Sequence, residues 1–283
     1  MTHCGLPSRF IGVFDSGVGG VSVWREIARQ LPHEDVVYLG DQAHVPYGLR
    51  SLDEVRSFSE GVVRFLLDHG AKVIVIACNA ASAASLYYLR NLFPEVPFVG
   101  MEPAVKPAAE RTRTGVVGVI ATRTTFQGKL FASLLQRYAR DVRVVTEVGS
   151  GLVEAVEAGA LDTPETEELL RKHLAPLVEA GADQLVLGCT HYPFLRSMIE
   201  RIVGDCMAVI DPAPAVARQT ACVLAREGLE AGYPRAGDHV FCTTGDVADF
   251  AAMLERLLPQ PVLQGNCEVR AARWREGRLE LVE

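Results

Sequence analysis

Two cysteines end two similar apolar segments of this chain. Cys78 lies in "VIVIACNAAS" and Cys189 in "QLVLGCTHYP", and in both cases small or polar residues follow. The pattern predicts a buried strand that ends in a turn into a helix. Because unpaired N–H groups and the dipole at a helix N-terminus lower the pKa of a thiol, we expect each cysteine to be available as a base or nucleophile. One such cysteine would suggest simple packing, whereas two at equivalent places favour catalysis.

Several other kinds of chemistry lack their motifs. The sequence contains no GxxxxGK[ST] loop, no C-x-x-C pair and no H-E-x-x-H pair, which argues against nucleotide hydrolysis and a zinc site. Ala84 and Leu195 stand where a Cys-x5-Arg phosphatase would need arginine. Two opposed thiols suit a two-base racemase or epimerase, in which one removes a proton from a tetrahedral carbon and the other delivers one to the opposite face.

We expect no cofactor and no metal. The four lysines stand in no recognisable Schiff-base context, and no cluster of metal-ligating residues is visible in the sequence. These lysines are Lys72, Lys106, Lys129 and Lys172.

The elements that would position the thiols come from an internal repeat. Four segments of the first half correspond, in the same order, to four segments of the second half. The pairs are FIGVFDSG with VVGVIATR, EDVVYLGD with RDVRVVTE, HGAKVIVIACN with AGADQLVLGCT, and FVGMEPA with AVIDPAP. The third pair aligns Cys78 with Cys189. We therefore predict a duplication.

Helical patterns separate these strands, so the predicted fold class is α/β, with two pseudo-symmetric, doubly wound lobes whose sheets are mostly parallel. The first lobe is predicted to comprise residues 1–103 and 213–283, since the helix, strand and helix patterns after residue 213 have no repeat counterpart. The second lobe would comprise residues 104–212. Ligands of open α/β sheets bind at the carboxyl ends of the strands, so Cys78 and Cys189 should face each other across the interlobe cleft.

The composition of the chain limits the kinds of molecule that it is expected to bind. The chain has 283 residues, a net charge of −7 and a pI near 5.6, so we expect no binding to nucleic acid or to a membrane and favour a small polar substrate. Seven cysteines, together with an N-terminus that lacks an apolar signal core, indicate reduced thiols and a cytoplasmic location. Five of the cysteines have no motif context and are interpreted as structural: Cys4, Cys206, Cys222, Cys242 and Cys267.

Six short motifs together resemble the glutamate racemases of the aspartate/glutamate racemase superfamily. They are GVFDSGVGG (12–20), GDQAHVPYG (40–48), ACNAASA (77–83), VEAG (156–159), GCTHYP (188–193) and DPA (211–213). The resemblance extends along nearly the whole chain. It implies cofactor-independent racemisation of glutamate that supplies D-glutamate for peptidoglycan.

The resemblance also implies roles for individual residues. Cys78 would act on D-glutamate with help from Asp15, and Cys189 on L-glutamate with help from His191. Glu157 matches an acidic residue of the family's active site. The residues that would contact the substrate are Ser16, Pro46, Tyr47, Gly48, Asn79, Ala80 and Thr190. Two positions depart from the family pattern, since Ala80 replaces a threonine and His44 replaces an arginine.

Other functions stay open at this point. The residues also suit an aspartate or related amino-acid racemase, since glutamate and aspartate differ by one methylene, which is worth only about 1–3 kcal/mol in a binding pocket. A related decarboxylase needs only one proton donor, and a non-catalytic, two-lobed amino-acid-binding protein needs no thiols at all. The family resemblance leaves the assembly state open, and a homodimer is one of the states it allows.

Overall fold

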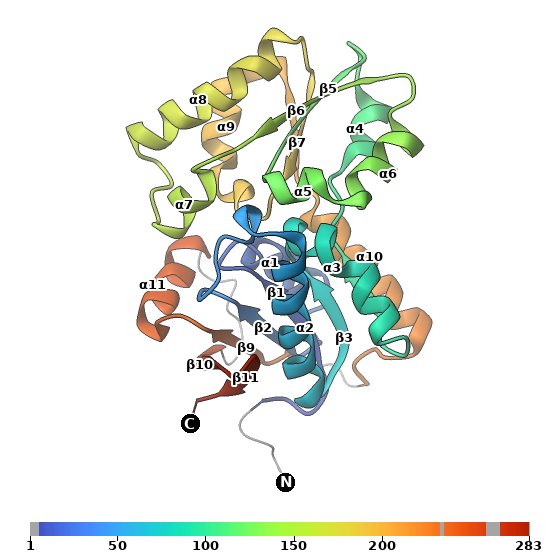
Figure 1. Cartoon of the computed structure of the whole chain (residues 1–283), viewed down its shortest axis with the longest axis vertical. Helices are drawn as coiled ribbons and strands as arrows, with labels where there is room; N and C mark the ends of the chain where they lie inside the picture. The colour runs from blue at the N-terminus through green and yellow to red at the C-terminus, as the bar shows by residue number, and fades with distance from the viewer. Residues whose placement is uncertain (1–5, 233–234, 259–266, 283) are drawn as a thin grey trace.

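Two separate sheets organise the protein (Figure 1). The computed structural model describes residues 6–232, 235–258 and 267–282, so Cys4 lies outside the described residues. Within these residues, one sheet has seven strands in the order β11-β10-β9-β2-β1-β3-β4, and the other has four in the order β6-β5-β7-β8. All neighbouring strands are parallel except β10 and β11. The predicted α/β class with two mostly parallel lobes is confirmed.

The lower lobe of Figure 1 contains the seven-stranded sheet. Its strands are β1 (Phe10–Asp15), β2 (Val36–Gly40), β3 (Ala71–Ile76), β4 (Phe98–Gly100), β9 (His239–Thr243), β10 (Cys267–Arg275) and β11 (Arg278–Leu281). Its helices are α1 (Val21–Gln30), the 3-10 turn η1 (Tyr47–Leu49), α2 (Leu52–Asp68), α3 (Asn79–Leu92), α10 (Ala213–Glu227) and α11 (Val247–Leu257).

The upper lobe contains the four-stranded sheet. Its strands are β5 (Val116–Ala121), β6 (Arg143–Val148), β7 (Gln184–Gly188) and β8 (Ala208–Ile210). Its helices are α4 (Val105–Arg111), α5 (Arg123–Gln127), α6 (Lys129–Tyr138), α7 (Leu152–Glu157), α8 (Pro164–Glu179), η2 (Tyr192–Leu195), α9 (Arg196–Val203) and η3 (Gly204–Cys206). The seven-stranded sheet therefore takes strands from both sides of this segment, while the proposed domain limits at residues 103 and 213 stay a prediction.

The strand order supports the duplication. The segment β2-β1-β3-β4 of the larger sheet has the same order as β6-β5-β7-β8. In the central pair of each sheet, Gly12 lies opposite Ile74 and Gly118 lies opposite Leu185. Cys78 lies four residues after Ile74, and Cys189 lies four residues after Leu185. The two cysteines therefore occupy equivalent positions.

One detail of the sequence alignment is wrong. It pairs Val36 with Val142, but Gly12 lies opposite Val37 in one sheet and Gly118 opposite Val145 in the other. The second strand pair is therefore shifted by two residues relative to the alignment. A shift of two preserves which face each side chain points to, so the apolar pattern alone could not detect it.

Local sequence explains the elements beside the site. All six residues of β1 are buried, as expected for a central strand of a parallel sheet covered on both faces. Helix α2 begins with a capping box in which Ser51 accepts the N–H of Glu54 and the Glu54 carboxylate accepts the N–H of Ser51. Gly70, with φ of +102°, follows α2 in a conformation that side-chain-bearing residues rarely adopt.

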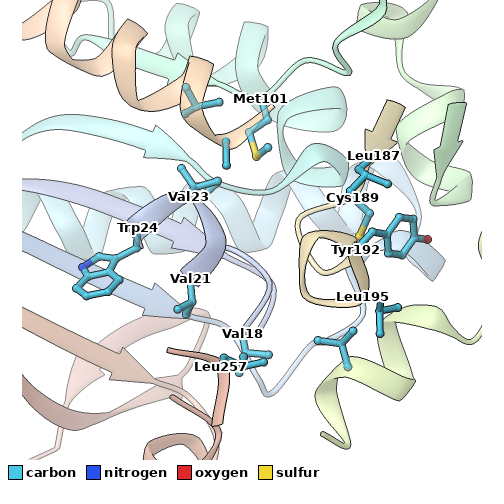
Figure 2. Close-up of a cluster of buried hydrophobic side chains, with 14 of the residues drawn as sticks. Val18, Val21, Val23, Trp24, Met101, Leu187, Cys189, Tyr192, Leu195 and Leu257 are labelled. Carbon is cyan, nitrogen blue, oxygen red and sulfur yellow. The ribbon is translucent and has the colours of Figure 1, made fainter. Parts of the chain in front are cut away.

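An apolar cluster passes from one lobe to the other (Figure 2). Val18, Val21 and Trp24 enter it from the first lobe, while Leu187 and Tyr192 enter it from the second. Burial of these side chains stabilises the contact between lobes as well as each lobe itself. The polar site lies at the edge of this cluster, which includes Cys189.

The hairpin of β10 and β11 has no counterpart in the sequence-based expectations. Strand β10 pairs with β9 and extends the larger sheet, and Glu276 and Gly277 form the turn to β11 with positive φ. None of the helices in the described part of the chain is long and apolar enough to cross a membrane.

Candidate active site

Both cysteines lie at the carboxyl ends of equivalent strands. Cys78 is the N-cap of α3, where its Sγ accepts the backbone N–H of Ala81 at 3.4 Å. Cys189 directly follows β7, and its Sγ lies 3.7 Å from Nδ1 of His191. The two thiols line the same small cavity between the lobes, with only 4% and 6% of their residue surfaces exposed.

The structure brings the other predicted site residues to the same place. The residues that share this cavity with the two thiols are Ser16, Pro46, Tyr47, Gly48, Asn79, Ala80, Thr190 and His191. Asp15 and Glu157 do not line the cavity but contact residues that do. Thr190 Oγ1 donates a hydrogen bond to Asp15 Oδ1 at 3.3 Å, and Glu157 pairs with His191.

The Cys78 side of the cavity is anionic and buried. Burial raises the pKa of the Cys78 thiol well above its usual value, and the neighbouring Asp15 carboxylate raises it further. Burial also raises the pKa of Asp15, although backbone N–H groups of Gly17 and Gly20 donate to its Oδ2. The expectation that the helix N-terminus would lower the pKa of this thiol is therefore wrong for Cys78, because loss of hydration outweighs one N–H contact.

The Cys189 side of the cavity is cationic. Burial alone would lower the pKa of His191, but its contacts with Cys189 and Glu157 raise that pKa well above its usual value. His191 Nε2 lies 2.6 Å from Glu157 Oε1. Burial opposes ionisation of Glu157, yet the bond to His191 leaves the pKa of this carboxyl below its usual value. A protonated imidazole thus lies beside the Cys189 sulfur.

Glu157 joins the two lobes. It ends α7 of the second lobe, and its Oε1 also accepts the N–H of Val18 from the first lobe at 2.9 Å. Its Oε2 accepts a hydrogen bond from Gln42 Nε2 at 3.0 Å. Glu157 does not lie on a solvated face of its helix, since only 15% of the side chain is exposed.

Glycines of the first loop allow this approach. A Cβ at Gly17 would overlap the Glu157 carboxylate, and a Cβ at Gly19 would overlap the His191 ring. The DSGVGG segment therefore needs glycine at these points because side chains of the opposite lobe occupy the space.

Asn79 is buried without partners. Only 3% of the residue is exposed, and neither amide atom has a hydrogen-bond partner among the described residues. A buried amide in this state loses hydration without compensation. Because Asn79 lines the cavity, its amide is placed to pair with a molecule bound there.

Sequence reasoning missed several residues of the site. Thr122, Thr125 and Val153 also line the cavity, and Gln42 holds Glu157. The internal repeat carried a signal for one of them, since the alignment of Gly12 with Gly118 places Thr122 opposite Ser16. No comparable signal exists for Gln42, whose contact depends on how the lobes meet.

Comparison with known proteins places this geometry in a family. The Asp/Glu/hydantoin racemase family model matches residues 11–220. A glutamate racemase of Roseiflexus sp. (strain RS-1) is 50% identical over 251 residues, which cover 88% of this chain and 92% of that protein.

Solved structures agree with the sequence match. The crystal structure of a glutamate racemase isoform from Bacillus anthracis has a TM-score of 0.83 and 34% identity, covering 98% of this chain and 100% of that one. The glutamate racemase of Francisella tularensis subsp. tularensis SCHU S4, solved in complex with D-glutamate, has a TM-score of 0.81 and 26% identity, covering 93% and 97%.

Proposed function

The chain belongs to the Asp/Glu/hydantoin racemase family and is an amino-acid racemase, and from this premise we propose that it interconverts L- and D-glutamate by a two-base mechanism without a cofactor. In the proposed reaction, Cys189 removes the Cα proton of L-glutamate and Cys78 delivers a proton to the opposite face. The reverse reaction exchanges these roles.

One observation supports the mechanism above all others. Cys78 and Cys189 stand at equivalent positions of the two repeats, on different lobes, and both line a single cavity. A carbon held between them can lose a proton to one sulfur and gain one from the other, which inverts its configuration. A binding protein would need the polar groups of the cavity but neither of the thiols.

The two thiols have neighbours of different charge, which suits them to different roles in proton transfer. His191, whose contacts raise its pKa, lies 3.7 Å from the Cys189 sulfur, and we propose that Cys189 is the base toward L-glutamate. The raised pKa of Cys78 keeps that thiol protonated, the form that acts as an acid. This arrangement corresponds to the enzyme form that accepts L-glutamate.

The cavity also offers the donors that a dicarboxylate substrate needs. We propose that Asn79 pairs with a substrate carboxylate, which would satisfy its buried amide. The hydroxyl of Ser16 and the N–H groups at the start of α3 supply further donors. Ala80 contributes a methyl group where the family usually has threonine, so this chain has one hydroxyl fewer in the cavity.

The product points to a cellular role. We propose that the enzyme supplies D-glutamate for peptidoglycan synthesis, as the family resemblance implies. We also propose that it works in the cytoplasm, because a mechanism with two free thiols requires a reducing compartment.

A hydrogen-isotope experiment tests the mechanism. With L-glutamate in heavy water, the D-glutamate formed at early times should carry deuterium at Cα, while recovered L-glutamate stays largely protiated. Starting from D-glutamate, the pattern should reverse. Nuclear magnetic resonance and chiral chromatography would measure both. Product that retains the original proton would contradict the two-base mechanism.

Substitutions of the thiols complete this test. Cys78→Ser and Cys189→Ser should each reduce racemisation in both directions by about 100- to 10,000-fold, because a hydroxyl is far too weak an acid to form the base. Cys222→Ser, which alters an exposed thiol, serves as the control. The intact enzyme should keep its activity in EDTA and with carbonyl reagents. Racemisation of aspartate but not glutamate would contradict the proposed substrate.

A further inference from the structure

Asp41 is a buried carboxylate that accepts four side-chain hydrogen bonds. It follows β2 and is fully buried. Oδ2 accepts bonds from His44 Nδ1 at 2.8 Å and Tyr47 Oη at 2.7 Å. Oδ1 accepts bonds from Thr244 Oγ1 at 2.9 Å and Trp274 Nε1 at 2.8 Å. Since an ionised carboxylate has about four acceptor positions, each donor fills one of them.

One of these donors comes from the last hairpin of the chain. Trp274 lies on β10, where it pairs with Leu279 of β11. Its ring packs against Gly61 of α2, since a Cβ there would lie 2.5 Å from the indole Cη2. His44, the residue that departs from the family pattern, stacks on Phe58 at 3.9 Å between centroids and lies edge-on to Trp274 at 5.4 Å. The indole is therefore held in one place and orientation.

The other donors connect this cluster to the active site. Tyr47 is fully buried, lines the cavity between the thiols and begins η1. The backbone N–H of Asp41 donates to the carbonyl of Asp15 at 3.0 Å. Asp41 thus links the wall formed by Pro46, Tyr47 and Gly48 to both the catalytic strand β1 and the distant hairpin.

We propose that Trp274 is a positioning residue for substrate binding, acting through Asp41 to hold Tyr47 and the cavity wall that Tyr47 forms. The proposal rests on the proposed racemase function and assigns a role to the β10–β11 hairpin. Loss of the indole N–H leaves one acceptor position of a buried carboxylate unfilled. Asp41 then has freedom to shift, and the Tyr47 hydroxyl shifts with it.

The test compares the two tryptophans of the chain. Trp274→Phe removes an N–H that is hydrogen bonded, whereas Trp24→Phe removes a buried N–H that has no partner among the described residues. We expect Trp274→Phe to raise KM for glutamate by about tenfold and to change kcat little, because the wall holds substrate and transition state alike. Trp24→Phe should leave KM unchanged. An equal KM for the two variants would overturn the proposal.

A spectroscopic measurement does not depend on the folding of Trp274→Phe. In the Trp24→Phe protein, Trp274 is the sole tryptophan, so its fluorescence reports the surroundings of Asp41. Glutamate should change this emission in a saturable manner as it orders Tyr47. An emission that glutamate leaves unchanged would overturn the proposal. If the unaltered enzyme does not racemise glutamate, the proposed function fails instead, which separates the two outcomes.

Discussion

His191 and Glu157 form a buried ion pair that gives one thiol a cationic neighbour, whereas Asp15 gives the other an anionic one. The two repeats therefore share a backbone design and differ in charge. The proposed mechanism uses such a difference, because it requires one sulfur to act as a base while the other acts as an acid. The equivalent strand orders account for the similar positions of the two thiols, and their different neighbours account for the difference in charge.

Glu157→Gln tests the ion pair. Neutralising Glu157 removes one cause of the raised His191 pKa, so this pKa should fall. Activity that needs cationic His191 is present below its pKa and lost as the pH rises through it. The alkaline limb of the kcat/KM profile should therefore move to lower pH.

The control for this variant is Glu154→Gln, on the exposed face of the same helix. Because L- and D-glutamate have equal free energies, kcat/KM must fall by the same factor in both directions, which checks the assay itself. A profile for Glu157→Gln that coincides with that of Glu154→Gln would show that the ion pair does not control His191.

At the scale of elements, helix α5 is hydrogen bonded to the segment at residues 47–50, which forms one wall of the site. Thr124 is almost fully buried, and its Oγ1 lies 3.3, 3.0 and 3.1 Å from the carbonyl oxygens of Tyr47, Gly48 and Arg50. The hydroxyl belongs to the second lobe and the carbonyls to the first. This contact fastens the lobes directly beside the substrate cavity.

Thr124→Val should loosen this contact. The valine keeps the shape but leaves the three carbonyls without their donor, so we expect a loss of about 1–3 kcal/mol in unfolding free energy and a higher KM for glutamate. Thr166→Val is the matched control, because Thr166 Oγ1 donates to the Ala160 carbonyl within the second lobe. Kinetics and thermal unfolding of both proteins would decide. A Thr124→Val protein that loses stability but keeps its KM would contradict the interlobe role.

Much of the architecture could be predicted because the repeat carried it. Continuous apolar runs such as VIVIA and QLVLG predict buried strands, and aligning these two strands identifies the equivalent cysteines. The β10–β11 hairpin could not be predicted in this way. Its segment alternates charged and apolar residues at a sheet edge, and its pairing with β9 depends on long-range contacts. Thr244 and Trp274, the distant partners of Asp41, were missed for the same reason.

At the scale of the whole molecule, the two thiols of the cavity are buried where the lobes meet. Cys78 and Cys189 are almost inaccessible, whereas Cys206, Cys222 and Cys267 are exposed. An alkylating reagent can reach the two site thiols only when the lobes separate or the protein unfolds. The rate of their modification therefore measures opening.

Glutamate should slow this modification. At a concentration 100 times its Kd, a ligand that binds only the closed form should reduce labelling of Cys78 and Cys189 by about 100-fold. Peptide mass spectrometry after iodoacetamide would follow each thiol separately. The exposed cysteines should react equally with and without glutamate, and Cys242, fully buried in the first lobe, reports global unfolding. Equal protection of all these thiols, or of none, would contradict a site between the lobes.

The larger sheet takes strands from before and after the smaller one in the chain, and this order has a consequence during synthesis. The N–H of Asp238, next to β9, bonds to Asp35, next to β2, across 203 positions of the chain. At 5–20 residues per second, a ribosome needs about 10–40 s to make that length. The second lobe is complete in sequence before β9 emerges and can fold early, while β2 keeps an open edge that can pair with other chains. The first lobe therefore exposes the edge of β2 until β9 has been made, and its sheet can be completed only after the second lobe has left the ribosome.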